Sequence, residues 1–235
     1  MIYSNWSEVY EESVYKLSFD TWFKGIFSEI ERIRIFNGSI LDAGCGTGIG
    51  YDALKNIGKF SFFGIDISNE MLNKSKGKYE NLTCTDIAEF DISEKVDIIV
   101  SGFGTLNYLN NYQLHSFFLS ASNVLKNDGY IIFDYNSPKY LEFDRKSNQY
   151  EQILSNSILK WDYHYDDIMK CSKLRLSNYV NNEKCWEENH AHFSYSTHDI
   201  YKIACDFNII KVRNLNSDTF TPNANTHVYL LKKNN

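Results

Sequence analysis

Strand-sized apolar runs alternate with helix-sized segments through the first 135 residues. Residues 6–35 repeat apolar positions at three- and four-residue steps, which predicts a helix, and residues 47–57 and 112–125 are interpreted as further helices. The apolar runs between them end at Asp42, Asp66, Asp86, Ser101 and Tyr135. Strands and helices that alternate in this way indicate a parallel sheet with right-handed crossovers.

The pattern changes at Asn136. Segments of the following stretch alternate partly with a period of two, as strands of an antiparallel sheet do; they are 158–165, 171–180 and 185–195. Asp166-Asp167 and Asn181-Asn182 fall where hairpin turns are expected. We therefore interpret residues 136–195 as an antiparallel insertion that covers the active site.

The last forty residues return to the earlier pattern. Thr197 is a plausible N-cap for a helix that extends to Phe207, and strands are predicted at 209–215 and 226–232. This pair fits an antiparallel hairpin at one edge of the sheet. The whole chain, residues 1–235, is thus predicted to be one α/β domain with an insertion.

Composition narrows the class of protein. Apolar residues make up 43% of the chain and charged residues 23%, as in ordinary globular proteins. No apolar run approaches the roughly 18 residues of a membrane span, and no signal peptide is visible, so we expect a cytoplasmic protein. The net charge of -6, with no basic cluster, argues against a nucleic-acid partner. A monomer or a homodimer is equally compatible with the sequence.

Three alternating glycines follow the first strand, in the segment Asp42-Ala-Gly44-Cys45-Gly46-Thr-Gly48. Glycine permits backbone dihedrals that a side chain forbids and lets a ligand lie against the main chain. Dinucleotide folds usually have Gly-x-Gly-x-x-Gly at this turn. Here the spacing differs, and Asp42 beside the loop disfavours a phosphate and favours a cationic group.

The combination of this loop with Asp66 at the end of the second strand resembles the class I S-adenosylmethionine-dependent methyltransferases. Their first motif is an Asp-x-Gly-x-Gly-x-Gly loop, and an acid after the second strand accepts the ribose hydroxyls of the cofactor. The resemblance implies a Rossmann-like, seven-stranded, mostly parallel sheet with the order 3-2-1-4-5-7-6. It also implies S-adenosylmethionine as cofactor and S-adenosylhomocysteine as product.

The resemblance also implies further cofactor contacts. In this family the residue after the acid and the Met of a Ser-x-x-Met segment pack on the adenine, and an Asp after the third strand accepts the adenine amino group. The cofactor-binding residues expected on this basis, including the glycine loop and the end of the fourth strand, are Asp42, Gly44, Cys45, Gly46, Asp66, Ile67, Met71, Asp86, Ile87, Ser101 and Gly102. Core packing is the alternative role of Met71.

The N-terminal segment resembles the lid of small-molecule methyltransferases, which begins with Tyr-Asp-x-x-Tyr and a later aromatic residue. Tyr10 and Trp22 occupy these places, although Glu11 replaces the Asp. We therefore expect residues 1–37 to form a helical lid in which Tyr10 and Trp22 contact the cofactor. Plain packing is the alternative for both side chains.

The segment Ser101 to Leu109 resembles the Ser-Leu-Asn-Tyr-Leu segment of small-molecule and amino-sugar methyltransferases. It lacks the Asn/Asp-Pro-Pro-Tyr/Phe motif of enzymes that modify bases, so a flipped nucleobase is disfavoured as acceptor. Tyr10 and Asn107 are the candidates for catalytic contacts. Other residues expected to line the acceptor site are Phe103, Tyr108, Asn136 and Tyr140.

His190 is the candidate general base. It shares one face of a predicted strand with His192, two residues later, so both side chains are expected to point into the cleft. A structural histidine is the alternative, and a metal site that includes Glu188 is another. We prefer the hypothesis without a metal. Five scattered cysteines with no Cys-x-x-Cys pair fit reduced thiols.

The sequence thus predicts a methyltransferase that acts on a nitrogen or oxygen of a small metabolite, such as an amino sugar or another secondary metabolite. Methyl transfer needs mainly an acceptor held in line with the reacting bond, and a base only when the acceptor enters protonated or as a hydroxyl. Methylation of RNA or protein, and binding of the cofactor without catalysis, are the alternatives.

Overall fold

The computed structural model describes residues 2–15, 19–144 and 148–234. Within these ranges the larger sheet has seven strands, in the order β3-β2-β1-β4-β5-β11-β10. Their bounds are β1 (Asn37–Ala43), β2 (Lys59–Asp66), β3 (Asn81–Cys84), β4 (Val96–Ser101), β5 (Leu125–Asn136), β10 (Phe207–Asn214) and β11 (Thr226–Lys233). Because β10 and β11 take the places of the sixth and seventh strands, the predicted order is confirmed.

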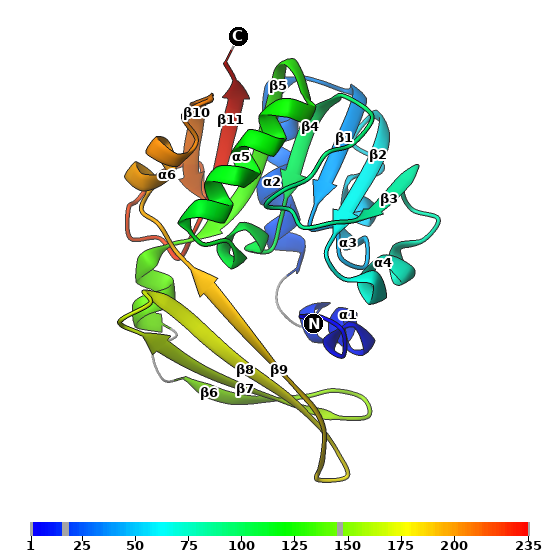
Figure 1. Ribbon diagram of the computed structural model, residues 1–235, viewed down its shortest axis with the longest axis vertical. Helices are drawn as coiled ribbons and strands as arrows, with labels where there is room; N and C mark the ends of the chain where they lie inside the picture. The colour runs from blue at the N-terminus through cyan, green and yellow to red at the C-terminus, as the bar shows by residue number, and fades with distance from the viewer. Residues whose placement is uncertain (1, 16–18, 145–147, 235) are drawn as a thin grey trace.

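Helices cover both faces of this sheet (Figure 1). One face carries α2 (Phe19–Ile33) and α3 (Ile49–Leu54), and the other carries α5 (Asn111–Val124) and α6 (Thr197–Ile203). Successive strand residues point to opposite faces. Accordingly, Ile131 and Phe133 of β5 belong to the apolar core beneath α5, whereas Ile132 belongs to the core beneath α2. None of the helices in the described ranges is long and apolar enough to span a bilayer.

Local capping decides where several helices begin. Ser68 caps α4 (Asn69–Ser75) as predicted, since its hydroxyl accepts the backbone N–H of Met71. The predicted N-cap of α6 is wrong by one residue. Ser196 caps this helix in a reciprocal pair with Asp199, and the helix ends at Ile203 because β10 already begins at Phe207. Strand β5 likewise includes residues 127–129, which were predicted as a turn.

The predicted antiparallel insertion forms a second sheet, whose strand order is β6-β7-β8-β9 (Figure 1). Its strands are β6 (Gln149–Ile153), β7 (Ile158–Asp166), β8 (Cys171–Val180) and β9 (Glu183–Phe193). Strand β6 was not predicted. Asn181 and Asn182, at the predicted hairpin turn, have φ of 51° and 66°. Two positive values in succession are typical of a type I′ turn, which matches the twist of the flanking strands.

The N-terminal segment lies between the two sheets (Figure 1). The single helix predicted for residues 6–35 is wrong in its first part: a 3-10 turn, η1 (Trp6–Glu8), precedes α1 (Tyr10–Tyr15), and residues 16–18 lie outside the described residues. Trp6 is buried against the second sheet, where its ring lies 5.3 Å from that of Trp161. The N-terminus is thereby tied to the insertion.

Candidate active site

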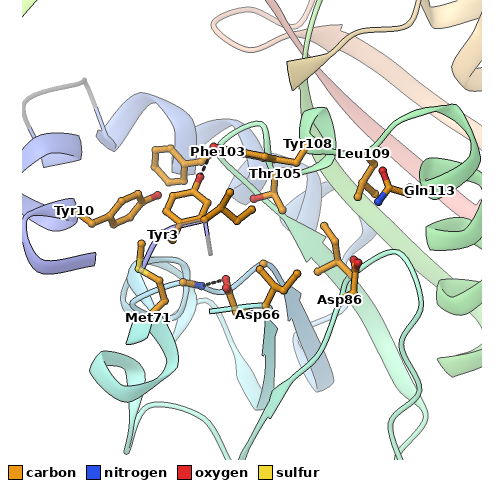
Figure 2. Close-up of a pocket in the computed structure, with 15 residues that line it drawn as sticks. Tyr3, Tyr10, Asp66, Met71, Asp86, Phe103, Thr105, Tyr108, Leu109 and Gln113 are labelled. Atoms are coloured by element: carbon orange, nitrogen blue, oxygen red, sulfur yellow. Dashed lines mark hydrogen bonds between the residues drawn. The ribbon is translucent and has the colours of Figure 1, made fainter. Parts of the chain in front are cut away.

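A pocket of about 170 Å³ opens where β1, β2 and β4 end; we call it the edge pocket (Figure 2). Open parallel sheets usually bind ligands at this edge. The residues of the sequence prediction that line it are Tyr10, Gly44, Gly46, Asp66, Ile67, Met71, Asp86 and Ile87. They come from the carboxyl ends of three neighbouring strands, from the loops that follow them, and from helices α1 and α4, so the structure brings together segments that are distant in sequence.

A smaller space of about 50 Å³, the loop pocket, adjoins the edge pocket. Asp42, Cys45 and Gly102 line it, together with Gly44 and Gly46, which line both spaces. Trp22 lies farther away and contributes to a third cavity, described below.

The glycines of the loop create the space that they border. Gly44 has φ of 80°, and a Cβ there would approach the Cγ2 atom of Thr105 to 2.4 Å. Gly46 has φ of 52°, and a Cβ there would meet no atom within 4 Å, so this residue faces open space. Its N–H donates to Asp66 Oδ2 at 2.8 Å, which fixes the loop to the end of β2 (Figure 2).

Two buried carboxyl groups decide the electrostatics of the site. Burial raises the pKa of Asp42 to about 7, in spite of the hydroxyl of Tyr79, which donates to Asp42 at 2.7 Å; the charge of Asp66 raises it further. Burial also raises the pKa of Asp66, against the backbone N–H groups of Ser68 and Gly46. A cationic ligand group would relieve both penalties, because it favours the ionised form.

A third cavity, of about 490 Å³, lies between the two sheets; we call it the aromatic cavity. Its polar residues include Asn136 and His192. Its aromatic residues are Tyr3, Trp6, Tyr10, Trp22, Phe103, Tyr108, Tyr140, Tyr150, Trp161 and Tyr163. Four of them, Tyr3, Tyr10, Phe103 and Tyr108, also line the edge pocket and so form a shared wall.

The backbone of this wall is held in an uncommon conformation. Phe103 has φ of 59°, a left-handed value that costs a residue with a Cβ about 1–2 kcal/mol. The ring of Trp22 stacks on the ring of Phe103 at 5.2 Å. Gly104, which follows Phe103, donates its N–H to Asp134 Oδ2 at 2.8 Å. Burial raises the pKa of Asp134 well above its usual range. Sequence analysis missed Asp134, although an acid within the apolar strand Ile131 to Tyr135 is a usable signal.

Two predicted site residues hold the scaffold instead. Asn107 is fully buried. Its Nδ2 group donates to the carbonyls of Asn136 and Phe193, and its Oδ1 atom accepts the N–H of Asn136. The hydroxyl of Ser101 donates to the carbonyl of Ala43 at 2.8 Å. Neither residue lines any of the three cavities as the structure describes them. A direct contact of Asn107 with the acceptor is therefore not what the geometry favours.

The predicted pair of histidines shares one buried face of β9, with Glu188. His192 lines the aromatic cavity, but His190 lies behind Tyr108, whose hydroxyl is 3.2 Å from His190 Nδ1. The prediction that His190 points into the cleft is therefore corrected. The described residues contain no group of three His, Cys, Asp or Glu side chains suited to a metal ion.

Comparison with known proteins identifies the fold. Residues 40–129 match the methyltransferase domain family. A protein of Bacillus subtilis (strain 168), named "Putative methyltransferase YqeM", is 32% identical over 144 residues, which are 58% of this chain and 56% of that protein. The match thus spans just over half the length of this relative.

Solved structures agree over most of the chain. An S-adenosylmethionine-dependent methyltransferase from Clostridium acetobutylicum ATCC 824 has a TM-score of 0.84 and 23% identity, with 100% of both chains covered. The sugar N-methyltransferase KedS8 from Streptoalloteichus sp ATCC 53650 has a TM-score of 0.75 and 14% identity, with coverage of 93% of this chain and 90% of its own. For CalS10, an amino pentose methyltransferase from Micromonospora echinaspora, the TM-score is 0.70 at 13% identity, with 94% and 97% covered.

The residues present fit the cofactor of this fold family. Asp66 and Asp86 supply acceptors in the edge pocket, and Ile67, Met71 and Ile87 supply apolar walls. Asp42 suits the α-ammonium group of S-adenosylmethionine, and the open space at Gly46 leaves room for its amino-acid end. Residues 40–129 therefore match a methyltransferase domain, and the chain as a whole has the fold of solved S-adenosylmethionine-dependent methyltransferases.

Proposed function

We propose that the protein transfers a methyl group from S-adenosylmethionine to a nitrogen or oxygen of a small metabolite, with an amino sugar or a related amine as the preferred class. One observation carries this proposal. Tyr10 and Phe103 line all three cavities, so the space suited to the cofactor and the space between the sheets meet at these two rings.

The cofactor would be held by the edge and loop pockets. Asp66 would accept the ribose hydroxyls and Asp86 the adenine amino group, while Ile67 and Met71 pack on the base. Asp42 faces the loop pocket, where the α-amino group would lie. When bound, S-adenosylmethionine supplies an activated methyl group with an excellent leaving group. The protein then needs mainly to orient an acceptor and to exclude water.

The aromatic cavity suits an amine acceptor. Ring faces attract cations, with estimates of about 0.5–2 kcal/mol each depending on desolvation. Tyr hydroxyls around the cavity can bind hydroxyl or amino groups of a sugar. The names of two structural neighbours, a sugar N-methyltransferase and an amino pentose methyltransferase, support the same class.

The position of the cavity favours a small molecule over RNA or protein. Its walls come from the N-terminal segment, the loop after β4, all four strands of the second sheet and the start of β11. A polymer would need an open groove, whereas this space lies between two sheets and beneath the N-terminal turn.

Isothermal titration with S-adenosylmethionine and S-adenosylhomocysteine tests the cofactor site first. We expect micromolar binding, and no binding at millimolar ligand would reject the proposal.

Transfer of a labelled methyl group to a panel of amino sugars and simple amines, with bulk RNA in parallel, tests the acceptor. Label that enters RNA but no small amine would reverse the preference. Cofactor binding without transfer to any of these would favour a non-catalytic binder.

A further inference from the structure

A chain of polar groups leads from the shared wall into the second sheet. The Tyr3 hydroxyl donates to the Tyr108 hydroxyl at 2.7 Å (Figure 2). The Tyr108 hydroxyl in turn lies 3.2 Å from His190 Nδ1. On the other side of the ring, His190 Nε2 lies 3.5 Å from Glu188 Oε2. Tyr3 and Tyr108 border both the edge pocket and the aromatic cavity, whereas His190 and Glu188 are only 4% and 5% exposed.

The donors and acceptors in this series can be ordered so that each group donates to the next. Because Tyr3 donates to the Tyr108 oxygen, the Tyr108 proton is available for His190 Nδ1. A neutral His190 that accepts at Nδ1 carries its proton on Nε2, which faces Glu188. With this tautomer, both hydroxyl protons of the series point away from the cavities and toward His190, and the Nε2 proton points toward the carboxylate.

The electrostatics of the series suit proton transfer. Burial raises the pKa of Tyr3 well above its usual range, so this hydroxyl stays neutral and passes a proton without holding charge. Burial also acts against ionisation of Glu188, but His190 and the backbone N–H groups of Asn5 and Trp6 outweigh it and lower its pKa. An ionised Glu188 would stabilise an imidazolium at His190.

We propose that Tyr3, Tyr108, His190 and Glu188 form the path by which the methyl acceptor loses its proton. This inference rests on the proposed methyl transfer. The acceptor N–H or O–H bond breaks and its proton goes to the Tyr3 oxygen, while the electron pair stays on the acceptor atom for the new bond to the methyl carbon. The Tyr3 proton moves to Tyr108, and the Tyr108 proton moves to His190 Nδ1. The imidazolium later returns this proton to solvent.

Glu188 also links this path to the N-terminal segment. Its carboxylate accepts the backbone N–H groups of Tyr3 at 2.9 Å, Asn5 at 2.6 Å and Trp6 at 3.2 Å. The carboxylate that faces His190 therefore also holds Tyr3 in place. The path is complete only when the N-terminal segment is docked on the second sheet, which gives this segment a chemical role in addition to that of a cover.

Other titratable groups also surround His190. Tyr10 of α1 lies against Tyr3, and His192 of β9 lies against Tyr108. Asp66 at the end of β2 acts on Tyr3 through its charge. A second hollow that His190 borders is lined by four further groups, Asp162, His164, Lys173 and Arg175. A change in the pH profile of a His190 variant can therefore be assigned to His190 only when these other groups are unchanged in that variant.

The tautomer of His190 tests the path without any acceptor. In the ligand-free, full-length protein labelled with ¹⁵N-histidine, long-range NMR correlations should show neutral His190 with its proton on Nε2. In Tyr108→Phe the hydroxyl donor to Nδ1 is gone, and we expect a mixture of tautomers. A wild-type ring protonated on Nδ1 would overturn the proposal, whether or not methyl transfer is observed.

Kinetics with an amine methylated in the transfer panel provide the second test. His190→Gln and Tyr108→Phe should lower kcat at pH 7 about 100-fold, the lower range for loss of a general base, while the Kd for S-adenosylhomocysteine changes less than twofold. Raising the pH should restore much of the loss, because the amine then enters deprotonated. The matched control is His198→Gln, because His198 of α6 is exposed and borders neither His190 nor the cavities described above.

These readouts separate the two proposals. Absence of cofactor binding rejects the proposed function and leaves the tautomer measurement valid. Wild-type kcat and an unchanged pH profile in both His190→Gln and Tyr108→Phe, in proteins that melt like the wild type, would overturn the proton path while methyl transfer stands.

Discussion

The two halves of the candidate site differ in the kind of contact that they offer a ligand. At the edge of the parallel sheet, buried carboxylates and glycine backbone predominate, with Asp42 and Asp66 beside the loop at Gly46. Between the sheets, stacked and edge-on rings predominate, for example Tyr150 on Trp161 at 5.6 Å. The first half, called the cofactor half, offers directional polar contacts. The second, called the aromatic half, offers ring faces, which suits the cationic acceptor proposed above.

The halves also differ in how the chain builds them. The cofactor half comes from loops that follow consecutive strands, so its residues occur in short motifs. The aromatic half depends on contacts between segments that are distant in sequence. Tyr3 and Glu188, for instance, are 185 positions apart. The first kind of site can therefore be read from local spacing, whereas the second appears only when the two sheets are placed together.

The largest effect should come from removing the charge that fixes the glycine loop. In Asp66→Ala, the cofactor loses an acceptor, and the N–H groups of Gly46 and Ser68 lose theirs. We expect a loss of about 3 kcal/mol, or roughly 100-fold in Kd, from titration with S-adenosylhomocysteine. Binding of the acceptor should weaken far less.

Asp91→Ala is the matched control, because Asp91 is an exposed aspartate in the loop before β4. Its Kd should equal that of the wild type. An unchanged Kd in Asp66→Ala would remove Asp66 from the cofactor site and would leave the carboxylates as purely structural groups.

A change in the aromatic half should have the opposite selectivity. Tyr150→Ala removes a ring that lines the aromatic cavity and is still 39% exposed, so the core should survive. The KM for an amine acceptor should rise about tenfold, the equivalent of roughly 1.4 kcal/mol. The Kd for S-adenosylhomocysteine should stay within twofold. A comparable loss in both constants would show that the two halves are not separate.

The sequence was sufficient for the sheet order and for part of the lining of the edge pocket, but not for Tyr3 or Thr105, which also border it. Those predictions used patterns that a few neighbouring residues define, such as Asp42 with Gly44 and Gly46. Asn107 was assigned by the same local reasoning, but its amide is used by the carbonyl of Phe193, which only the second sheet brings near. The roles of Tyr3 and Glu188 could not be derived for the same reason, since nothing local pairs a turn at the N-terminus with β9.

The titration of Asp42 should make the affinity for S-adenosylhomocysteine depend on pH. This effect is smaller than those above and is specific to the cofactor half. Its pKa of about 7 means that the folded, ligand-free protein holds this proton up to near neutrality. A ligand ammonium pairs with the ionised form, so binding releases a proton and affinity rises with pH. Between pH 6 and 7.5 the ionised fraction, and with it the affinity for S-adenosylhomocysteine, should increase about eightfold.

Asp42→Asn should flatten this profile. 5′-Methylthioadenosine, which lacks the amino-acid end, should show no comparable rise with wild-type protein. An equal rise for both ligands would place the titrating group elsewhere, outside the loop pocket.

The smallest effect on ligand binding is expected at a part of the second sheet that is specified locally, the turn between β8 and β9. Asn182 has φ of 66° in a turn whose preferred sequence is Asn-Gly. Asn182→Gly removes a Cβ from the left-handed region and should stabilise the protein by about 0.5 kcal/mol, or roughly 1–2 °C in Tm. Asn182→Val places a β-branched residue there and should destabilise the protein by about 1–2 kcal/mol.

Both variants should bind S-adenosylhomocysteine like the wild type, because the turn lies outside the pockets of the cofactor half. A weaker Kd in either variant would mean that even this hairpin is coupled to the cofactor, and that the division between the two halves does not extend to their energetics.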